Sequence, residues 1–419
     1  MLIIRDFHLN KPFDVIKRDI EIPTDTGKII TLIGVRRCGK TSILYECINQ
    51  LSQNIDKTHI LFINFEDERF DFNQQNLDLI LKAYVELYPE LDLKKCYFFF
   101  DEIQNVLGWE KFVRRVYDTV SKNIFVTGSN SKMLSLDIAT SLRGRTITFE
   151  VLPLSFKEYL RFENVTIDLN SSKSLSLINN RLGKYLTQGG FPEIALLGEE
   201  FHDKILQDYF SVLIYKDLVE RFNINNTPAL KFFLKRVLAS STKQISVNKI
   251  YNDLKASGIK VGKNTLYEYL DHVEDIYLSL TLQKYTTKIL AGTDKKIYSI
   301  DVGINNAISF KFSDDIGKAI ENTVFLELRR QGHQLFYYAD RTSECDFILQ
   351  SKDKIIQAIQ VTYDMTNDKT RKREIKGLVK VCKAFGLDQG LIITYNEESE
   401  MIMDGIEIKV IPLYLFLLG

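Results

Sequence analysis

Five short apolar runs alternate with amphipathic stretches over the first third of the chain. The runs occupy 29–34, 60–65, 96–101, 123–128 and 146–151. Their apolar residues are mostly consecutive, as is typical of strands that helices cover on both faces. The stretches between them, at 40–51, 75–88 and 109–121, carry apolar residues at helical spacing. This pattern predicts an α/β fold with a doubly wound parallel sheet.

The pattern changes three times further along the chain. Residues 151–225 are mainly helical, with a Gly-Gly-Phe-Pro break at 189–192. Helix-like segments at 227–240, 246–256 and 263–276 and an alternating run at 277–285 follow, an order typical of a winged helix-turn-helix. Mixed α/β character then returns, with strands expected near 334–338, 345–349, 355–361 and 390–394. Because the chain is too long for one core, we predict four domains, at 1–150, 151–225, 226–300 and 301–419.

Composition limits the classes of function only weakly. Hydrophobic residues make up 45% and charged residues 26% of the chain, as in ordinary soluble globular proteins. Lys plus Arg and Asp plus Glu both number 55, so the net charge is zero. A net charge of zero gives no overall support for nucleic-acid binding, although a local basic surface would still allow it.

Cysteine usage and the N-terminus indicate the compartment. Five scattered cysteines, without CxxC pairs or histidines at zinc-ligand spacing, are typical of free thiols in a reducing compartment: Cys38, Cys47, Cys96, Cys345 and Cys382. The N-terminus has no signal-peptide apolar core, and no apolar run approaches the roughly 20 residues that cross a bilayer. We expect a cytoplasmic protein without membrane contact.

A glycine-containing segment follows the first apolar run. Residues 34–41 read GVRRCGKT and fit GxxxxGK[ST] between a predicted strand and a predicted helix. Gly34 and Gly39 permit backbone angles that point N–H groups at a phosphate, and the helix N-terminus adds its positive end. Lys40 is expected to bridge the β- and γ-phosphates, and the Thr41 hydroxyl to ligate Mg²⁺. The expected ATP-binding residues are Gly34, Val35, Arg36, Arg37, Cys38, Gly39, Lys40, Thr41 and Ser42.

A pair of carboxylates ends the apolar run at 96–101. A complete strand and helix separate this run from the first one, the order found in P-loop ATPases with an additional central strand. Asp101 is expected to hold Mg²⁺ through water, and Glu102 to orient and deprotonate the attacking water. Glu102 therefore predicts hydrolysis of ATP, because a chain without it would be expected only to bind the nucleotide.

Several segments together resemble a known family. The P-loop, DEIQN (101–105), VTGSNSKML (126–134) and LRGRTITFEVLPLSFKEYL (142–160) are similar to AAA+-type ATPases of bacteria and archaea. The similar proteins carry a C-terminal restriction-endonuclease-like domain of unknown function. The resemblance continues through GGFPE (189–193), YKDLVERF (215–222) and YSIDVGINNA (298–307) into the C-terminal third.

The resemblance implies further roles at the nucleotide. Ser129 or Asn130, after the fourth strand, would contact the γ-phosphate or the attacking water. Arg145, and with less support Arg143, would neutralise charge in the transition state. Such an arginine usually enters from a neighbouring subunit, so the activity could require a homo-oligomer. The alternative is that residues 142–145 form a solvated loop before a strand.

The predicted winged helix has two open uses. Lys260, Lys263, Asn264 and Tyr267 are suitable for contacting double-stranded DNA at the start of the last helix. Further along the same helix four acidic residues would repel phosphate unless turned away: Glu268, Asp271, Glu274 and Asp275. Use as a nucleotide lid or a protein-docking module is the alternative.

For the C-terminal third, the resemblance implies a nuclease-type site made of a helix acid, a strand aspartate and an acid-x-Lys on the next strand. Glu321 or Glu327 would be the helix acid and Asp346 the strand acid. Gln360 and Thr362 occupy the positions where the acid and the lysine are expected, so a vestigial site is favoured over an active nuclease. Asp364 or Lys354 are the nearby residues that would have to substitute for the missing acid or lysine. The basic run 369–386 fits a phosphate contact, or more commonly one buried helix face with a solvated lysine-rich side.

Three functions follow from these features. The first is Mg²⁺-dependent hydrolysis of ATP that drives conformational change in the C-terminal domains. The second is a nucleotide-gated module that binds DNA or protein and turns over slowly. The third is an ATP-dependent nuclease.

Overall fold

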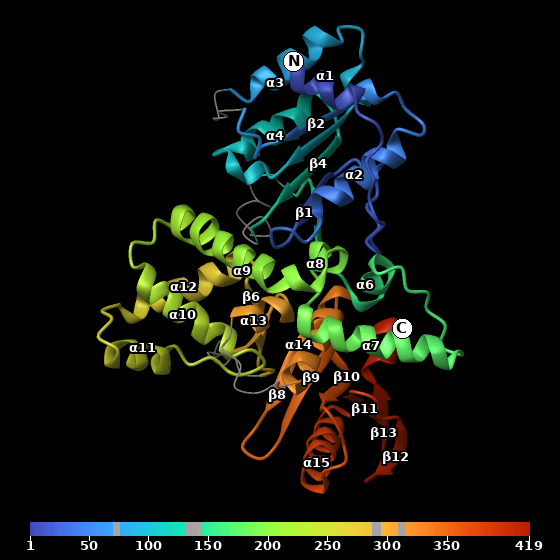
Figure 1. Cartoon of the computed structure of the whole chain (residues 1–419), viewed down its shortest axis with the longest axis vertical. Coiled ribbons are helices and arrows are strands. Elements are labelled where there is room, and N and C mark those ends of the chain that lie inside the picture. Colours follow the sequence, from blue (N-terminus) through green and yellow to red (C-terminus); the bar gives the residue numbers. More distant parts are fainter. Residues whose placement is uncertain (70–75, 131–141, 143, 287–294, 309–315) are drawn as a thin grey trace. The chain divides into compact units, whose positions relative to one another are not determined.

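The computed structural model describes residues 1–69, 76–130, 142, 144–286, 295–308 and 316–419 (Figure 1). The chain forms two compact units, Met1–Val151 and Leu152–Gly419. Arg143 and residues 131–134 of the motif at 126–134 lie outside the described residues.

The first unit is built on five parallel strands in the order β2-β3-β4-β1-β5. The strands are β1 (Ile29–Ile33), β2 (Ile60–Asn64), β3 (Tyr97–Asp101), β4 (Asn123–Gly128) and β5 (Thr146–Glu150). Four α-helices and three short 3₁₀ helices accompany them in the described part of this unit: α1 (Leu2–Leu9), α2 (Lys40–Leu51), α3 (Asp78–Leu87), α4 (Trp109–Thr119), η1 (Lys57–His59), η2 (Leu93–Lys95) and η3 (Ile103–Asn105). The predicted parallel α/β fold is confirmed, and β4 is the additional strand between β1 and β3.

The consecutive apolar runs are explained by burial on both faces of this sheet. Every residue of β1 is buried, and so are Phe98, Phe99 and Phe100 of β3. The Phe99 ring stacks on Phe125 of β4 with 4.5 Å between ring centroids, and Phe100 packs against Phe112 of α4. Aromatic stacking of this kind holds neighbouring strands in register.

The second unit begins with the predicted helical region. It contains α6 (Phe156–Phe162), α7 (Ser172–Gln188), α8 (Pro192–Leu196), η5 (Glu199–Phe201), α9 (His202–Val212) and the π-helical turn η6 (Leu213–Glu220). Ser155 and Glu158 form a reciprocal capping box that starts α6. Gly189, with φ of 83°, ends α7 at the predicted break.

Three helices and an antiparallel strand pair follow, in the predicted order. They are α10 (Thr227–Ala239), α11 (Val247–Ala256), α12 (Lys263–Asp275), β6 (Ser279–Gln283) and β7 (Lys295–Ser299). Asn226, Ser246 and Gly262 precede the three helices, and the side chains of Asn226 and Ser246 cap the first two.

The rest of the chain is a six-stranded mixed sheet in the order β12-β13-β11-β10-β9-β8 with helices. Its elements are α13 (Val302–Ile308), α14 (Ile316–Arg330), β8 (Gln334–Ala339), β9 (Glu344–Ser351), β10 (Lys354–Val361), α15 (Asp368–Phe385), β11 (Gln389–Thr394), β12 (Ser399–Met403), β13 (Ile406–Pro412) and α16 (Leu413–Leu418). Residues Ile375, Leu378 and Cys382 of α15 pack into the core of this sheet. The basic run at 369–386 therefore has one buried face, as its apolar spacing predicts.

The hairpin of β12 and β13 is an element that the sequence analysis missed. Asp404 and Gly405, with φ of 52° and 83°, form its two-residue turn. An Asp-Gly pair between strand-like segments is a hairpin signal that was available in the sequence.

The cysteines and the helices can each be compared with what the sequence predicts. All five cysteines are buried free thiols. Among the described residues, we find no helix that is both long enough and apolar enough to span a bilayer.

Candidate nucleotide site

The loop after β1 is shaped by close backbone packing. A Cβ atom on Gly34 would lie 2.0 Å from the carbonyl oxygen of Val151, so only glycine fits there. Gly39, with φ of 98°, precedes Lys40, the first residue of α2. Because the first N–H groups of a helix have no partner within it, the loop and the start of α2 form a site suited to an anion.

Lys40 lies inside this loop and is only 3% exposed. Its Nζ donates to the carbonyl oxygens of Gly34 and Val35, both at 3.1 Å, and pairs with Oε1 of Glu102 at 3.3 Å. Burial by itself disfavours the charged ammonium, but the Glu102 carboxylate raises the pKa of Lys40 above its usual value. The lysine is therefore charged and placed in the loop before any phosphate is bound.

Asp101 ends β3 directly beside Thr41. The Thr41 hydroxyl donates to Oδ2 of Asp101 at 2.8 Å, and the Thr127 hydroxyl donates to Oδ1 at 2.5 Å. Burial, and then the neighbouring Glu102, raise the pKa of Asp101 to about 6. A hydroxyl and a carboxylate side by side at the phosphate loop are hard oxygen donors that fit Mg²⁺.

Glu102 is held by residues that the sequence analysis did not assign. Its backbone has φ of 51°, in the left-handed region, and its N–H donates to Thr127 Oγ1 at 2.8 Å. Gln104 Nε2 donates to Glu102 Oε2 at 2.6 Å and to Ser129 Oγ at 3.2 Å. Burial favours the neutral acid, but Lys40 and then Gln104 lower the pKa of Glu102 below its usual value. The carboxylate is therefore ionised and aimed by an amide that also contacts Ser129.

Predicted site residues from three strands thus meet at the carboxyl edge of the sheet. Thr41 and Lys40 follow β1, Asp101 and Glu102 follow β3, and Ser129 follows β4. Asn130 lies next to Ser129 and is half-buried.

Arg145 is not brought to this edge. β5 runs parallel to β1 with Thr146 beside Ile29, and the Ile29 N–H donates to the Arg145 carbonyl oxygen at 2.8 Å. Arg145 therefore lies at the amino end of the strands, whereas the loop at 34–41 follows their carboxyl end. Its guanidinium pairs with Asp118 at 3.1 Å and lies over the Tyr117 ring.

Other polar residues near the P-loop also have defined partners. Arg18, which the sequence analysis did not single out, is buried and donates from Nη1 to the Cys38 carbonyl oxygen at 2.7 Å. Arg36 pairs with Glu66, after β2, at 2.5 Å. Asp67 and Arg69 pair with each other in the loop that follows.

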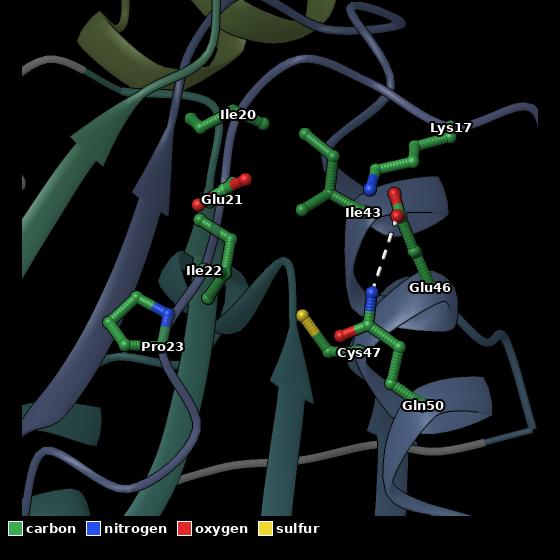
Figure 2. Close-up of a pocket in the computed structure, with 9 residues that line it drawn as sticks. All are labelled: Lys17, Ile20, Glu21, Ile22, Pro23, Ile43, Glu46, Cys47 and Gln50. Carbon is green, nitrogen blue, oxygen red and sulfur yellow. Dashed lines mark hydrogen bonds between the residues drawn. The ribbon is translucent and has the colours of Figure 1, made fainter.

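A pocket of about 430 Å³ lies on another side of α2. Figure 2 shows Ile20, Glu21, Ile22 and Pro23 along one wall and α2 side chains along the other. The α2 wall consists of Ile43, Glu46, Cys47 and Gln50, with Lys17 at the rim near Glu46. Gln50 Nε2 donates to Glu46 Oε1 at 3.4 Å. The pocket thus offers apolar walls and amide and carboxylate groups along α2, beginning at Ile43, one turn after the P-loop lysine.

The second unit gathers the predicted nuclease-type residues at a different place. Glu321 of α14 and Asp346 of β9 meet around Lys296 of β7, which the sequence analysis did not assign. Gln360 of β10 lies beside Asp346 and accepts a hydrogen bond from its backbone N–H. Burial, and then Asp346, raise the pKa of Glu321 to about 8. Glu327 is not part of this cluster, because it pairs with Arg330 at 3.3 Å.

The two proposed substitutes for the missing acid and lysine are elsewhere. Asp364 accepts hydrogen bonds from Thr366 within its own turn. Lys354 is exposed at the start of β10. Thr362 donates to the Asp364 carbonyl oxygen and contributes no charge.

The residues proposed for DNA contact on and before α12 are solvent-exposed. Lys260, Lys263, Asn264 and Tyr267 are exposed, but so are Glu268 and Asp271 of the same helix. Glu274 pairs with Lys295 at 3.6 Å. The surface of α12 therefore carries both signs of charge and does not decide between the two uses.

Comparison with known proteins identifies three regions. Residues 26–160 match the family described as an AAA domain. Residues 179–315 and 316–416 match two domains of unknown function, DUF8612 and DUF4143. The solved Walker-type ATPase PABY2304 of Pyrococcus abyssi is similar with a TM-score of 0.43 and 16% identity, over 67% of this chain and 90% of that one.

Two relatives match along most of the chain. An uncharacterized protein of Haemophilus influenzae is 29% identical over 389 residues, which cover 92% of this chain and 93% of that protein. The uncharacterized protein MJ1544 of Methanocaldococcus jannaschii is 40% identical over 411 residues, which cover 95% of this chain and 89% of that protein. The chain therefore belongs to the same protein family as MJ1544, and its N-terminal unit is an AAA+-like P-loop ATPase domain.

Proposed function

We propose that this protein binds ATP with Mg²⁺ at residues 34–42 and hydrolyses it. The assembly of Lys40, Thr41, Asp101 and Glu102 at one edge of the sheet supports this proposal most directly. Thr41 and Asp101 would hold the Mg²⁺, Asp101 through water. The ion would neutralise charge on the phosphate oxygens.

Lys40 has to change partners when a nucleotide arrives. Its ammonium now donates to two loop carbonyl oxygens and pairs with Glu102. Phosphate oxygens would compete for the same donors, and the ammonium would turn toward the β- and γ-phosphates. Glu102 would then be released from its cation and become the group that accepts a proton from the attacking water.

Gln104 and Ser129 would position that base. The Gln104 amide joins Glu102 Oε2 to the Ser129 hydroxyl, so the carboxylate cannot rotate freely. Ser129 or the neighbouring Asn130 would contact the γ-phosphate or the attacking water, and Ser129 would link that contact to Gln104 and Glu102.

The nucleotide base would occupy the pocket between residues 20–23 and α2. One wall of the pocket begins at Ile43, one turn after Lys40 on α2. A base attached to phosphates at the start of α2 would extend along the helix toward this wall. Ile22 and Ile43 would pack against the ring faces, and Gln50 or Glu46 would pair with its polar edge.

The finer assignments of the second unit are also part of this proposal. Residues 226–300 would be a winged helix-turn-helix, and 301–419 a restriction-endonuclease-like domain whose helix acid Glu321 and strand acid Asp346 meet at Lys296. Hydrolysis would change the conformation of these regions. A nucleotide-gated module with slow turnover, acting on DNA or protein, is the second candidate.

Phosphate release by the full-length chain tests hydrolysis. Wild type should turn over ATP with Mg²⁺, Lys40→Ala should neither bind nor hydrolyse it, and Glu102→Gln should bind without turnover. Lys95→Ala and Glu90→Gln, at exposed positions of the same unit, serve as matched controls. Normal hydrolysis by Glu102→Gln would refute the assigned base. Tight binding with little turnover in wild type, relieved by double-stranded DNA, would favour the second candidate.

A further inference from the structure

The second unit contains a buried charge cluster that plays no part in nucleotide binding. The Lys296 ammonium lies among three carboxylates: it is 2.8 Å from Glu344 Oε1, 3.1 Å from Asp346 Oδ1 and 3.4 Å from Glu321 Oε1. The Lys296 side chain is 5% exposed. An ammonium group has three donors, and this one meets three acceptors.

Lys296 enters this cluster from outside the sheet that supplies the carboxylates. Glu344 and Asp346 are on β9 and Glu321 is on α14, whereas Lys296 is on β7, the second strand of the hairpin after α12. The hairpin is docked next to β8: Tyr285 N–H donates to the Tyr337 carbonyl oxygen at 2.8 Å, and Lys296 lies over the Tyr337 ring. The cation is therefore supplied by a neighbouring structural element.

Two carboxylates of the cluster accept further hydrogen bonds. Asp346 Oδ2 accepts from the Val361 N–H at 3.1 Å, and Glu321 Oε1, which pairs with Lys296, also accepts from the Tyr298 hydroxyl at 2.8 Å. The neutral Gln360 donates through Nε2 to Glu374 at 2.6 Å and accepts the Asp346 N–H at Oε1 at 3.3 Å. Its amide oxygen is thus turned to the backbone and away from the ammonium.

These residues do not fit the divalent cation that a nuclease-type site would require. Such a cation sits between carboxylates and needs their oxygens and open positions for water. Here a lysine ammonium occupies the centre. With the ammonium in place, Glu321, Glu344 and Asp346 are not arranged to hold a metal ion, and neither is any other group of three or more His, Cys, Asp or Glu side chains in the described parts of the chain.

We propose that Lys296 takes the place of the divalent cation in this centre, so that the C-terminal domain is metal-free and its charge cluster fastens the β6–β7 hairpin to the sheet. Two buried carboxylates without a cation would be strongly unfavourable, and the ammonium compensates them permanently. The site is then latent: removing the lysine charge should open it to a divalent metal. This inference does not depend on ATP hydrolysis.

The test measures Mn²⁺ binding to the nucleotide-free full-length chain by calorimetry. Lys296→Met removes the charge and keeps the length of the side chain. It should gain one Mn²⁺ site that wild type lacks, and Mn²⁺ should raise its melting temperature. The gain should disappear in the double variant Lys296→Met, Asp346→Asn. Any weak Mn²⁺ binding at Thr41 and Asp101 is the same in all variants, so it does not affect the difference between them.

Lys295→Met is the matched control, because Lys295 precedes Lys296 on β7 and pairs with Glu274, outside the cluster. It should bind no additional metal. Lys296→Arg keeps the charge and should also bind none.

Three results would overturn the proposal. The first is a folded Lys296→Met variant that gains no Mn²⁺ site. The second is Mn²⁺ binding by wild type that Asp346→Asn abolishes. Mn²⁺-dependent cleavage of plasmid DNA by wild type, lost in both Lys296→Met and Asp346→Asn, would instead make Lys296 a catalytic lysine. If Lys296→Met does not fold, the comparison of wild type with Asp346→Asn decides: Mn²⁺ binding lost in Asp346→Asn overturns the proposal, and identical binding supports it.

Discussion

Two adjacent carboxylates end β3, and their surroundings separate their acidities. Asp101 is buried and beside a second carboxylate, which raises its pKa to about 6. Glu102 is also buried, but Lys40 and Gln104 lower its pKa. Different environments for two neighbouring acids are a common way of giving them different tasks. Here Asp101 is suited to a metal that replaces its proton, and Glu102 to accepting a proton while already ionised.

Asp101 should make the nucleotide-free protein less stable as pH rises. Its pKa is near 3.8 when unfolded and about 6 when folded, so its stabilising effect is complete below pH 3.8 and lost as pH rises through 6. A difference of this size corresponds to about 3 kcal/mol. Between pH 4 and pH 7, the stability of Asp101→Asn should therefore increase relative to that of wild type, as measured by urea unfolding without Mg²⁺. Asp301, also with a raised pKa, is common to both proteins and cancels. A constant difference across this range would contradict the prediction.

Gln104→Ala should impair turnover more than binding. The variant loses the donors to Glu102 and Ser129, so kcat should fall roughly tenfold, a part of what a positioned base contributes, while KM for ATP changes little. Because the Gln104 amide helps to lower the pKa of Glu102, the acidic limb of the pH–kcat profile should also move to higher pH. Asn105→Ala, at the exposed neighbouring position, is the control. If the pH–kcat profile of Gln104→Ala matches that of wild type, Gln104 does not position Glu102.

At the scale of elements, the turn after α7 and the end of β7 are joined by one carboxylate. The fully buried Asp301 accepts from the backbone N–H groups of Gly190 at 2.7 Å, Gly303 at 2.8 Å and Ile304 at 3.2 Å. A Cβ on Gly189 would lie 2.0 Å from Asp301 Oδ1. The two glycines of the GGFPE motif therefore leave room for a side chain that ties the helical region to α13.

Asp301→Ala should destabilise the second unit by at least about 3 kcal/mol, because three buried N–H groups lose their acceptor and each costs about 1–3 kcal/mol. Urea unfolding followed by circular dichroism measures the effect. Asp208→Ala, on the exposed face of α9, should change stability by less than about 0.5 kcal/mol. Equal midpoints for the two variants would show that the Asp301 contacts do not matter for stability.

At the scale of the whole molecule, the parallel sheet separates Arg145 from the nucleotide site of its own chain. Its position at the amino ends of β5 and β1 leaves the length of a strand between it and the P-loop. If Arg145 stabilises the transition state, it does so in a second copy of the chain. It would first have to leave its ion pair with Asp118.

Mixing two inactive variants tests this assignment. Arg145→Ala should lose about 10³-fold in turnover, and Lys40→Ala should be inactive. A mixture should recover activity, since the first variant supplies an intact P-loop and the second an intact arginine. Turnover per chain in wild type should also rise with protein concentration. Arg5→Ala, at an exposed position of α1, should behave as wild type. A mixture as inactive as its components would exclude an arginine supplied in trans.

Local features of the sequence were enough to predict the strands of the parallel sheet, the P-loop and the acidic pair. Consecutive apolar residues require burial on both faces, and glycines with Lys40 and Thr41 at fixed spacing define a phosphate loop from neighbouring residues alone. Four of the six strands of the C-terminal sheet were also predicted. The hairpin of β12 and β13 was not, although Asp404-Gly405 is a hairpin signal, and neither were the short helices α13 and α16.

Contacts between distant residues were decided only by the tertiary structure. Gln104 reaches Ser129 because β3 and β4 are neighbours, Arg145 is remote from the P-loop because β5 is parallel to β1, and Lys296 meets Asp346 because the β6–β7 hairpin docks beside β8. Backbone preference and periodicity act over a few residues, so they specify elements and loops. The partners of a charged side chain depend on which elements pack together, and spacing along the chain does not contain that information.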